Sequence, residues 1–439
     1  MEVFSKLVDE YSYIYLLESV EGPRNLAEFS FISFNPKKMI TVKNGETDIL
    51  EGKARTVIKT NDPLETVKKA IAPRMVSHRF RLVGGAVGYI SYDAVRYWEN
   101  LPNDTIDDLK LPDLEMGIYD DGILIDHTSQ RGYYYYLNEN RFHEVKKHLE
   151  KPLIEKDDDL RFSEPQLNVS KEDFEKAVRK AKRYIFDGDI FQTVLSKRYE
   201  FNFTGSLVNF YKVLRRINPS PYMYFLKYGD RQVVGSSPEM LVRVEKGIIE
   251  TYPIAGTRPK VEDPKRNSAL AQELLSDPKE RAEHIMLVDL ARNDIGRVSE
   301  YGSVTVPELM TVHQYSHVQH IVSKVTGYLS PNYDCFDCLK VMLPAGTVSG
   351  APKVRAMEII EELEPNKRGI YAGAVGYFSY NNNADFAIAI RTLVAEADRA
   401  YIQAGGGIVA DSDPEREWFE TEHKTEALMK ALSKAGEKL

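Results

Sequence analysis

Two segments of the chain combine a helix start with a closely spaced pair of glutamates. The first is Asp277-Pro278 with Glu280 and Glu283, and the second is Asp413-Pro414 with Glu417 and Glu420. In each, the aspartate can cap free N–H groups and the proline suits the first helical position. A spacing of three residues then places both carboxylates on one helix face. Taken alone, such a pair is typical of a solvated first turn, where acidic residues favour the helix dipole.

The neighbours of these glutamates indicate burial, which favours a second interpretation. Glu283 directly precedes the apolar block 284–290, and Glu417 and Glu420 flank Trp418-Phe419. A carboxylate beside buried apolar surface needs a cation or a proton. Mg²⁺ takes one or two protein carboxylates, keeps several waters and leaves positions for an anionic substrate. We therefore expect a magnesium site bridged by the two helices.

Three glycine-bearing segments, 253–259, 344–353 and 403–408, supply hydroxyls and free backbone N–H groups. None matches the GxxxxGK[ST] or GxGxxG patterns, so nucleotide binding has no support. Each segment alone is typical of a tight turn, but together they are suited to binding carboxylates. Arg391, within the apolar run 386–393, also needs an anion, because an unpaired buried guanidinium is costly.

The two cysteines, Cys335 and Cys338, form a CxxC pair. A zinc site would need a second pair or nearby histidines, and a redox motif would follow directly on a strand. Here Ser330-Pro331-Asn332 precedes the pair and an apolar helical pattern follows. We therefore interpret both cysteines as small apolar residues one helical turn apart.

The composition of the whole chain excludes several classes of protein. The 439 residues carry a net charge of −8, with 43% hydrophobic and 28% charged residues, which is typical of a globular protein with a large core. A general nucleic-acid binder would have an excess of basic residues. No apolar run reaches the length of a membrane span, and the first ten residues lack the basic and apolar parts of a signal peptide. We expect a cytoplasmic enzyme with no nucleic-acid or membrane partner.

The elements that position these residues are predicted to fall into two domains. Residues 1–145 alternate short apolar runs with polar turns, which predicts a strand-rich domain. The charged stretch from Glu144 to about Pro165 predicts a helix end and a solvated linker. The second domain, 166–435, begins with a helix capped by Ser170 and Asp173 and then interleaves helices with strands.

One octapeptide occurs twice. GAVGYISY at 85–92 returns as GAVGYFSY at 373–380, with seven of eight residues identical. Glycines inside a strand pattern mark places where another backbone comes close. We therefore predict two equivalent strands packed at the centre of a duplicated two-sheet core, with chance similarity as the weaker alternative.

Six segments together resemble the chorismate-utilising enzymes. They are Gly188-Asp-Ile-Phe-Gln192, Gly235-Ser-Ser-Pro-Glu239, Pro253-Ile-Ala-Gly-Thr-Arg258, the stretch 283–294, the segment 345–353 and Gln403-Ala-Gly-Gly-Gly407. Order and spacing match over about residues 170–430, and the first domain is similar to the family's N-terminal domain. The resemblance implies an α+β fold in which two stacked, largely antiparallel sheets are flanked by helices in a duplicated α/β/β/α sandwich.

The resemblance also implies how substrate and metal are bound. Mg²⁺ would be held by Glu283 and Glu420, with Glu280 and Glu417 behind them through water. Chorismate is a dicarboxylate. The residues implied to bind it are Gly256, Thr257, Tyr371, Arg391, Gly405, Gly406 and Gly407. Its ring carboxylate would lie on Mg²⁺ and the three consecutive glycines, and its enolpyruvyl carboxylate on Arg391 and Tyr371.

Three residues are implied to be catalytic. Glu239 aligns with the family's general acid, and burial would have to raise its pKa for it to carry a proton at neutral pH. His320 aligns with the histidine beside the leaving hydroxyl, and Thr347 belongs to the same group. Without the resemblance, His313, His317 and His320 are equally interpreted as ordinary surface histidines.

Two positions distinguish the reactions within the family. Members that add water carry a lysine base where Gln192 stands, and glutamine cannot act as a base. Many aminodeoxychorismate-forming members carry a lysine nucleophile in place of Ala255, and alanine offers none. We therefore expect ammonia to add at C2 of chorismate and pyruvate to leave, giving anthranilate in the first step of tryptophan biosynthesis. Aminodeoxychorismate formation is the alternative within the family.

Two further segments resemble the halves of the family's tryptophan feedback pocket. Glu18 and Ser19 belong to the first, and Pro221, Tyr222 and Met223 to the second. Ser19 is expected at the polar end of the ligand, and the second segment shapes an apolar slot. Each segment taken singly is also consistent with a strand end or a turn. Their pairing predicts feedback inhibition by tryptophan.

The expected partner is a glutamine amidotransferase subunit. Neither cysteine lies at a glycine-rich strand-to-helix turn, so no such unit is expected within this chain. Ammonia would come from a separate glutaminase subunit or from free ammonium, in a heterotetramer with two copies of each chain. The alternative from another class is a catalytically inactive tryptophan-binding regulator. The intact Glu283, Glu420, Arg391 and His320 argue against it.

Overall fold

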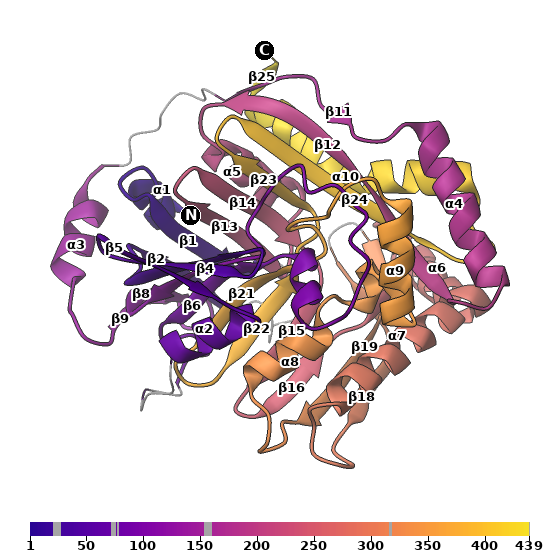
Figure 1. Ribbon diagram of the computed structural model, residues 1–439, viewed down its shortest axis with the longest axis horizontal. Helices are drawn as coiled ribbons and strands as arrows, with labels where there is room; N and C mark the ends of the chain where they lie inside the picture. The colour runs from indigo at the N-terminus through magenta and orange to yellow at the C-terminus, as the bar shows by residue number, and fades with distance from the viewer. Residues whose placement is uncertain (21–27, 72–75, 77–78, 153–159, 316–317, 439) are drawn as a thin grey trace.

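The computed structural model describes residues 1–20, 28–71, 76, 79–152, 160–315 and 318–438. Residues 153–159 of the predicted linker and His317 lie outside the described residues. The described chain forms two large sheets with helices on their outer faces (Figure 1).

The first sheet takes its strands from both ends of the sequence. In spatial order they are β25 (Glu437–Lys438), β10 (Arg161–Phe162), β12 (Gln192–Thr204), β24 (Arg399–Ile408), β23 (Thr392–Glu396), β14 (Arg231–Ser237), β13 (Tyr222–Tyr228), β1 (Tyr13–Glu18), β2 (Phe29–Phe34), β8 (Asp121–Asp126) and β9 (Arg131–Tyr136). Two short strands, β11 (Gln166–Leu167) and β20 (Gly350–Ala351), also pair with β12. The neighbours are antiparallel, except that β10 and β25 run parallel.

The second sheet is likewise assembled from distant segments. In spatial order its strands are β17 (Ile254–Pro259), β19 (Val318–Tyr328), β16 (Ile248–Thr251), β15 (Met240–Glu245), β22 (Ala384–Ile388), β21 (Ala374–Ser379), β6 (Gly85–Ile90), β7 (Leu114–Tyr119), β3 (Lys38–Lys43), β4 (Glu46–Glu51) and β5 (Ala54–Lys59). The strand β18 (Thr305–Gln314) pairs with β19.

Helices cover the outer faces of both sheets. They are α1 (Glu2–Leu7), α2 (Pro63–Ala70), α3 (Phe142–Glu150), α4 (Lys171–Phe186), α5 (Val208–Ile217), α6 (Pro264–Ser276), α7 (Pro278–Gly296), α8 (Cys335–Met342), α9 (Lys353–Leu363) and α10 (Pro414–Ala435), with short 3₁₀ turns η1 (Tyr92–Tyr97) and η2 (Gly346–Val348). On the first sheet, α10 packs against β24, α4 and α5. On the second, α7 packs against β17 and β19, and α8 against β15. Figure 1 shows these two helical groups on opposite sides of the sheets.

Buried aromatic and aliphatic residues fill the layer between the sheets. Tyr15 and Tyr224 come from the first sheet, and Tyr89, Tyr119 and Tyr377 from the second. Separate apolar clusters lie between each sheet and its helices. The predicted α+β fold with two stacked, largely antiparallel sheets flanked by helices is therefore confirmed.

The two copies of the repeated octapeptide form β6 and β21, which are neighbours at the centre of the second sheet. Gly88 lies opposite Gly376 in an antiparallel register. A Cβ on Gly376 would stand 2.0 Å from the carbonyl oxygen of Asp385, so no side chain fits there. The predicted pair of equivalent strands lies side by side within one sheet.

Both sheets cross the predicted boundary between residues 145 and 166. β1 pairs with β13, and β6 pairs with β21, so strands of the first predicted domain continue sheets of the second. The two-domain division therefore stays a prediction. Among the described residues, no helix is long and apolar enough to span a membrane.

The CxxC pair lies on α8, as its helical pattern predicts. Cys335 and Cys338 are both buried free thiols. Burial raises the pKa of both thiols well above its ordinary value, so neither carries the thiolate that cysteine chemistry needs. They serve as apolar residues of the core.

Candidate active site

The two carboxylate-bearing helices begin where the sequence predicts. Asp277 accepts hydrogen bonds from the backbone N–H groups of Lys279 and Glu280 at the start of α7, and Asp413 accepts one from Arg416 at the start of α10. Both helices have proline at the first position. These caps fix where the first turn of each helix points its carboxylates.

The carboxylates of α7 and α10 interact electrostatically. Burial raises the pKa of Glu283, and the nearby charges of Glu280 and Glu420 raise it further. Burial also raises the pKa of Glu417, again with a contribution from Glu420. Glu417 is only 8% exposed, and its Oε2 has no hydrogen-bond partner within the described chain. Four acidic groups therefore share a partly buried region that needs compensating positive charge.

Cations already reach the edges of this region. Lys424 forms an ion pair of 2.7 Å with Glu420, and its ammonium donates to the carbonyl oxygen of Gly405 at 3.1 Å. Arg258 donates to Glu280 at 3.2 Å. Sequence reasoning missed Lys424, although its position one helical turn after Glu420 places it on the same face.

The donor set fits an open magnesium site. Among the described residues, no three His, Cys, Asp or Glu side chains converge into a ready-made metal cage. Mg²⁺ does not need one, because it binds through one or two carboxylates and takes its other ligands from water and substrate. The oxygen-only donors and the unpartnered Oε2 of Glu417 suit such an ion.

The three consecutive glycines of β24, Gly405, Gly406 and Gly407, allow side chains from other elements to approach the backbone of this strand closely. A Cβ on Gly405 would stand 2.6 Å from the hydroxyl of Tyr371, and one on Gly407 would stand 2.6 Å from Nε2 of Gln192. A Cβ on Gly406 would stand 3.1 Å from Oε2 of Glu417. Any side chain here would displace one of these groups. The glycines therefore join Tyr371 to the carboxylates of α10.

Arg391 is the unsatisfied cation of the site. Its backbone has φ of 52°, a left-handed conformation that non-glycine residues rarely adopt, and strain of this kind is concentrated at functional sites. Its guanidinium has no hydrogen-bond or ion-pair partner among the described residues. Burial lowers its pKa, while Tyr371, Glu239 and Glu420 lie close enough to raise it. A cation without a partner in such a place is ready to bind an anionic ligand.

Glu239 is a carboxylic acid that titrates near neutrality. It follows β14, and its carbonyl oxygen accepts a hydrogen bond of 3.1 Å from the N–H of Ile388. Burial raises the pKa of Glu239 to about 7, and the Thr347 hydroxyl, Arg391 and Lys424 only partly oppose this effect. The raised pKa that a general acid requires is therefore present.

His320 has one ring nitrogen, Nε2, with no partner among the described residues. Its Nδ1 lies 2.8 Å from the carbonyl oxygen of Gly256, which can only accept, so Nδ1 carries the hydrogen and donates. The hydroxyl oxygen of Thr257 lies 3.1 Å from the same nitrogen. Burial lowers the pKa of His320, so the ring is neutral and Nε2 is left as an acceptor.

Gly256 connects this histidine to α7. Its φ of 63° favours glycine, and a Cβ there would stand 2.8 Å from Oε2 of Glu280. The structure thus links the predicted catalytic, substrate-binding and metal-binding residues through a continuous series of contacts and charge interactions from His320 to α10.

Comparison with known proteins identifies the family of this chain. Residues 12–430 match the family described as chorismate binding enzyme. Anthranilate synthase component 1 of Methanothermobacter marburgensis is 46% identical, with 100% of this chain and 94% of that protein covered. The chain belongs to the anthranilate synthase component 1 family of chorismate-binding enzymes. This finding confirms both the resemblance seen in the sequence and the prediction of an enzyme.

Two further relatives agree. Anthranilate synthase component 1 of Pseudomonas aeruginosa is 43% identical over 99% of this chain and 93% of that protein. The crystal structure of anthranilate synthase component I from Streptococcus pneumoniae shares 39% identity, with a TM-score of 0.83, and covers 93% of each chain.

In this chorismate-binding enzyme, the predicted tryptophan-pocket residues surround a separate cavity between the sheets. This partly open cavity is lined by all five of them, Glu18, Ser19, Pro221, Tyr222 and Met223. The Glu18 carboxylate is already satisfied, because Tyr211 and Arg215 donate to it. The Ser19 hydroxyl is buried and has no partner among the described residues.

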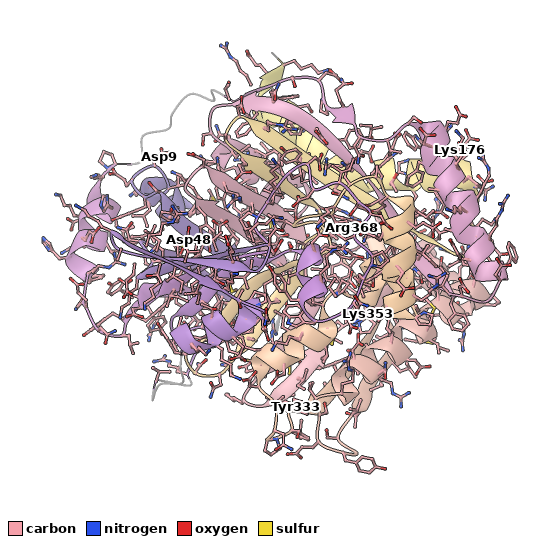
Figure 2. The ribbon with its side chains drawn as sticks, viewed as in Figure 1. Asp9, Asp48, Lys176, Tyr333, Lys353 and Arg368 are labelled. Atoms are coloured by element: carbon pink, nitrogen blue, oxygen red, sulfur yellow. The ribbon has the colours of Figure 1, made fainter. Side chains whose placement is uncertain are left out.

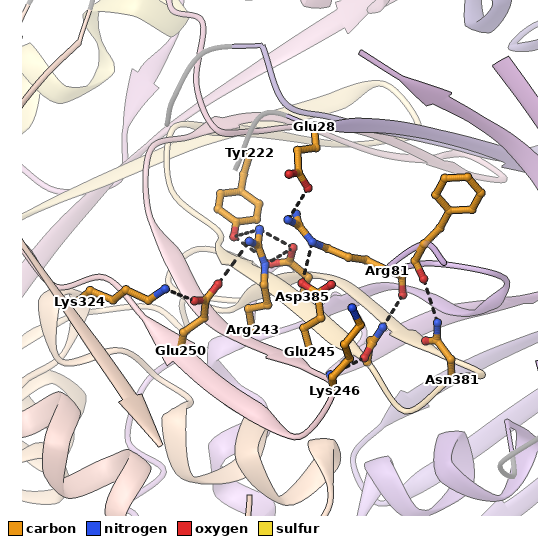
Figure 3. Close-up of polar contacts among 12 residues, drawn as sticks. Glu28, Arg81, Tyr222, Arg243, Glu245, Lys246, Glu250, Lys324, Asn381 and Asp385 are labelled. Atoms are coloured by element: carbon orange, nitrogen blue, oxygen red, sulfur yellow. Dashed lines mark hydrogen bonds and ion pairs between the residues drawn. The ribbon is translucent and has the colours of Figure 1, made fainter. Parts of the chain in front are cut away.

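A polar network, which sequence reasoning missed, borders this cavity (Figure 3). Arg243 donates to Asp385 at 2.8 Å and to the hydroxyl of Tyr222 at 3.2 Å, and that hydroxyl donates to Asp385 at 2.8 Å. Arg81 pairs with Glu245 at 2.9 Å. The cavity therefore combines apolar walls with both signs of charge, which suits a zwitterion with an aromatic side chain.

The titration of Glu239 has a measurable effect on stability. A carboxyl whose pKa is higher in the folded state stabilises that state below its ordinary pKa, and this contribution is lost as the pH rises through about 7. We expect the free energy of unfolding of Glu239→Gln, relative to the native protein, to rise by up to about 3 kcal/mol between pH 4.5 and pH 8. Urea unfolding at both pH values measures this difference. An unchanged difference would contradict a buried, titrating Glu239.

Proposed function

We propose that this chain converts chorismate and ammonia into anthranilate and pyruvate, with Mg²⁺, as a cytoplasmic enzyme of tryptophan biosynthesis. One observation carries the proposal. Glu239, an acid with a pKa of about 7, lies close to Arg391, whose guanidinium has no partner among the described residues, and Gln192 stands where water addition would need a base. The similarity to anthranilate synthases of other organisms supports the same reaction.

Chorismate binding follows from the charges of the site. Its two carboxylates need two separate positive regions. Arg391 and the Tyr371 hydroxyl would bind the enolpyruvyl carboxylate. Residues 405–407 would approach the ring carboxylate closely, because they have no side chains. Glu283 and Glu420 would hold Mg²⁺, with Glu280 and Glu417 behind them, and its charge would offset the ring carboxylate.

The chemistry then requires a proton at the leaving oxygen. Glu239 would donate its proton to the C4 hydroxyl, and the C4–O bond breaks as ammonia forms a bond to C2. The unprotonated Nε2 of His320 would accept a hydrogen bond from that hydroxyl and orient it. Gln192 cannot deprotonate water, and Ala255 offers no nucleophile, so C2 stays open to ammonia. Loss of pyruvate then yields the aromatic product.

Ammonia would be supplied by a separate glutamine amidotransferase subunit, component II, or by free ammonium. The name component 1 carried by the relatives supports such a partner. We propose a heterotetramer with two copies of each chain.

The decisive experiment is a fluorescence assay of the purified chain with chorismate, Mg²⁺ and excess ammonium at mildly alkaline pH. Anthranilate emission that appears over time is the expected result, and added tryptophan should suppress it. Consumption of chorismate without this emission would instead support aminodeoxychorismate formation. No consumption, even with a glutaminase subunit present, would support a tryptophan-binding regulator.

Tryptophan is proposed to bind in the cavity between the sheets, and Ser19 tests this assignment. The Ser19 hydroxyl is buried and unpartnered in the described chain, so a ligand group can satisfy it. We expect Ser19→Ala to weaken tryptophan inhibition about 10-fold, the value of one hydrogen bond, with kcat unchanged. Inhibition curves at several tryptophan concentrations measure the shift. An inhibition constant equal to that of the native protein would show that the Ser19 hydroxyl does not bind tryptophan.

A further inference from the structure

Arg368 is a fully buried arginine outside the predicted catalytic and substrate-binding residues. It lies between α9 and β21, and its side chain is only 1% exposed. Figure 2 shows it near the middle of the molecule, whereas Lys176 and Tyr333 lie at the periphery. Burying a guanidinium is costly unless every donor finds a partner. The partners of its guanidinium therefore indicate its structural role.

The terminal nitrogens of Arg368 join two segments that border the predicted site. One terminal nitrogen donates to the carbonyl oxygen of Val348 at 2.7 Å, and the other to that of Val194 at 2.6 Å. Val348 directly follows Thr347, and Val194 lies opposite Gly407 in the sheet. One planar group thus fixes the spacing between the Thr347 turn and the strand that supports the glycines.

Glu364 extends this connection. It accepts from Nε of Arg368 at 2.9 Å and from a terminal nitrogen at 2.6 Å. The same carboxylate accepts from the backbone N–H of Ser196 at 2.7 Å and from its hydroxyl at 2.8 Å. Ser196 lies opposite Gly405, and Gln403 donates to its hydroxyl at 2.8 Å. The ion pair therefore reaches both strands around the glycines.

The guanidinium plane also packs on an active-site ring. The Arg368 carbon Cζ lies 5.6 Å from the ring centroid of Tyr371 and 4.8 Å from that of Tyr92. A small pocket adjoins this contact and is lined by Arg368, Tyr371 and Gln403 among others. The guanidinium of Arg368 is therefore one of the groups that hold the Tyr371 ring in place.

We propose that Arg368 is a positioning residue, which holds Tyr371, the Thr347 turn and the Gly405–Gly407 strand in the arrangement that binds chorismate. It touches no reacting atom and acts through these three segments. This inference rests on the proposed function, because it assigns a role in chorismate binding. Lysine cannot substitute, since a single ammonium lacks both the planar face and the fork of donors.

The test compares chorismate binding without turnover in the native protein, Arg368→Lys and Arg368→Met. Binding is measured by calorimetry with Mg²⁺ and no ammonia. We expect both variants to bind chorismate about 10- to 100-fold more weakly. The matched control is Arg231→Lys. Arg231 is a mostly buried arginine, with its side chain 14% exposed, and it pairs with two glutamates, Glu115 and Glu396. This variant should bind chorismate as the native protein does.

A double-mutant cycle separates positioning from a general structural role. In the native background, Tyr371→Phe removes a positioned hydroxyl. In the Arg368→Lys background the same change should have a smaller effect on affinity, because the ring is no longer held. Additive effects, or native affinity in Arg368→Lys, would overturn the inference. If Arg368→Met fails to fold, Arg368→Lys and Glu364→Gln carry the test. Absence of chorismate binding by the native protein would instead contradict the proposed function.

Discussion

Glu239→Gln is expected to lower kcat about 10³-fold while chorismate still binds. Glutamine keeps the size and hydrogen-bonding groups of the side chain but cannot donate a proton to a leaving hydroxyl, and a positioned general acid contributes about 10²- to 10⁴-fold to rate. Burial raises the pKa of Glu239 to about 7, so the native carboxyl is largely protonated below that pH. Steady-state anthranilate formation and calorimetric chorismate binding together measure the two effects.

The pH profile provides the control for this prediction. Since the protonated form of Glu239 is the active one, the acid-dependent step in the native enzyme should slow as the pH rises through about 7. The residual activity of Glu239→Gln should not show this decline. If the variant kept a native kcat, or the same falling limb, the general acid would have to be another group.

Glu283→Gln is expected to lower the apparent affinity for Mg²⁺ by at least about 100-fold and, at fixed metal, nearly to abolish turnover. The change removes one carboxylate charge from the region shared with Glu280 and Glu420. Changing a residue that only contacts a metal ligand typically lowers metal affinity or activity about 10- to 100-fold, so changing a direct ligand should lower it more. Titration of activity against Mg²⁺ gives the apparent affinity, and direct Mg²⁺ binding by calorimetry does not depend on activity.

Two variants on α10, one at a predicted Mg²⁺ ligand and one at an exposed glutamate, provide the comparisons for this prediction. Glu420→Ala should behave like Glu283→Gln, because the charge of Glu420, on α10, acts on Glu283. Glu426→Gln changes an exposed glutamate of the same helix and should leave the Mg²⁺ titration unchanged. Unaltered chorismate turnover in Glu420→Ala would remove Glu420 from the magnesium site.

The parts of the site that could be predicted are those determined by local sequence. The caps at Asp277 and Asp413 and the three-residue spacing of the glutamates are local features, and the helices begin where they predict. The resemblance of six ordered segments added the family and the fold. The need for an anion at Arg391 also followed from sequence, because a charge within an apolar run needs a partner.

The parts that could not be predicted depend on contacts between distant segments. No pattern in the sequence shows that Arg368 meets Val194 and Val348, because those contacts depend on the sheet register and on the turn after α8. The polar network around Arg243 is hidden for the same reason, since its members come from several strands. Helical periodicity could have placed Lys424 beside Glu420, but nothing else in the sequence pointed to a role for this lysine. The sequence therefore predicted the chemical groups of the site better than the residues that hold those groups in place.

The pairing of β6 with β21 also has a consequence for biosynthesis of the chain. Gly88 meets Gly376, so a ribosome must make most of the protein before the middle of the second sheet can close. Until then β6 can pair with β7 on one edge, but its other edge has no β21 to pair with. In the same way, β1 can pair with β2 while its other edge still lacks β13. Contacts between such distant residues slow folding and leave strand edges open to aggregation. Newly made molecules of this enzyme should therefore depend on chaperones more than their final stability suggests.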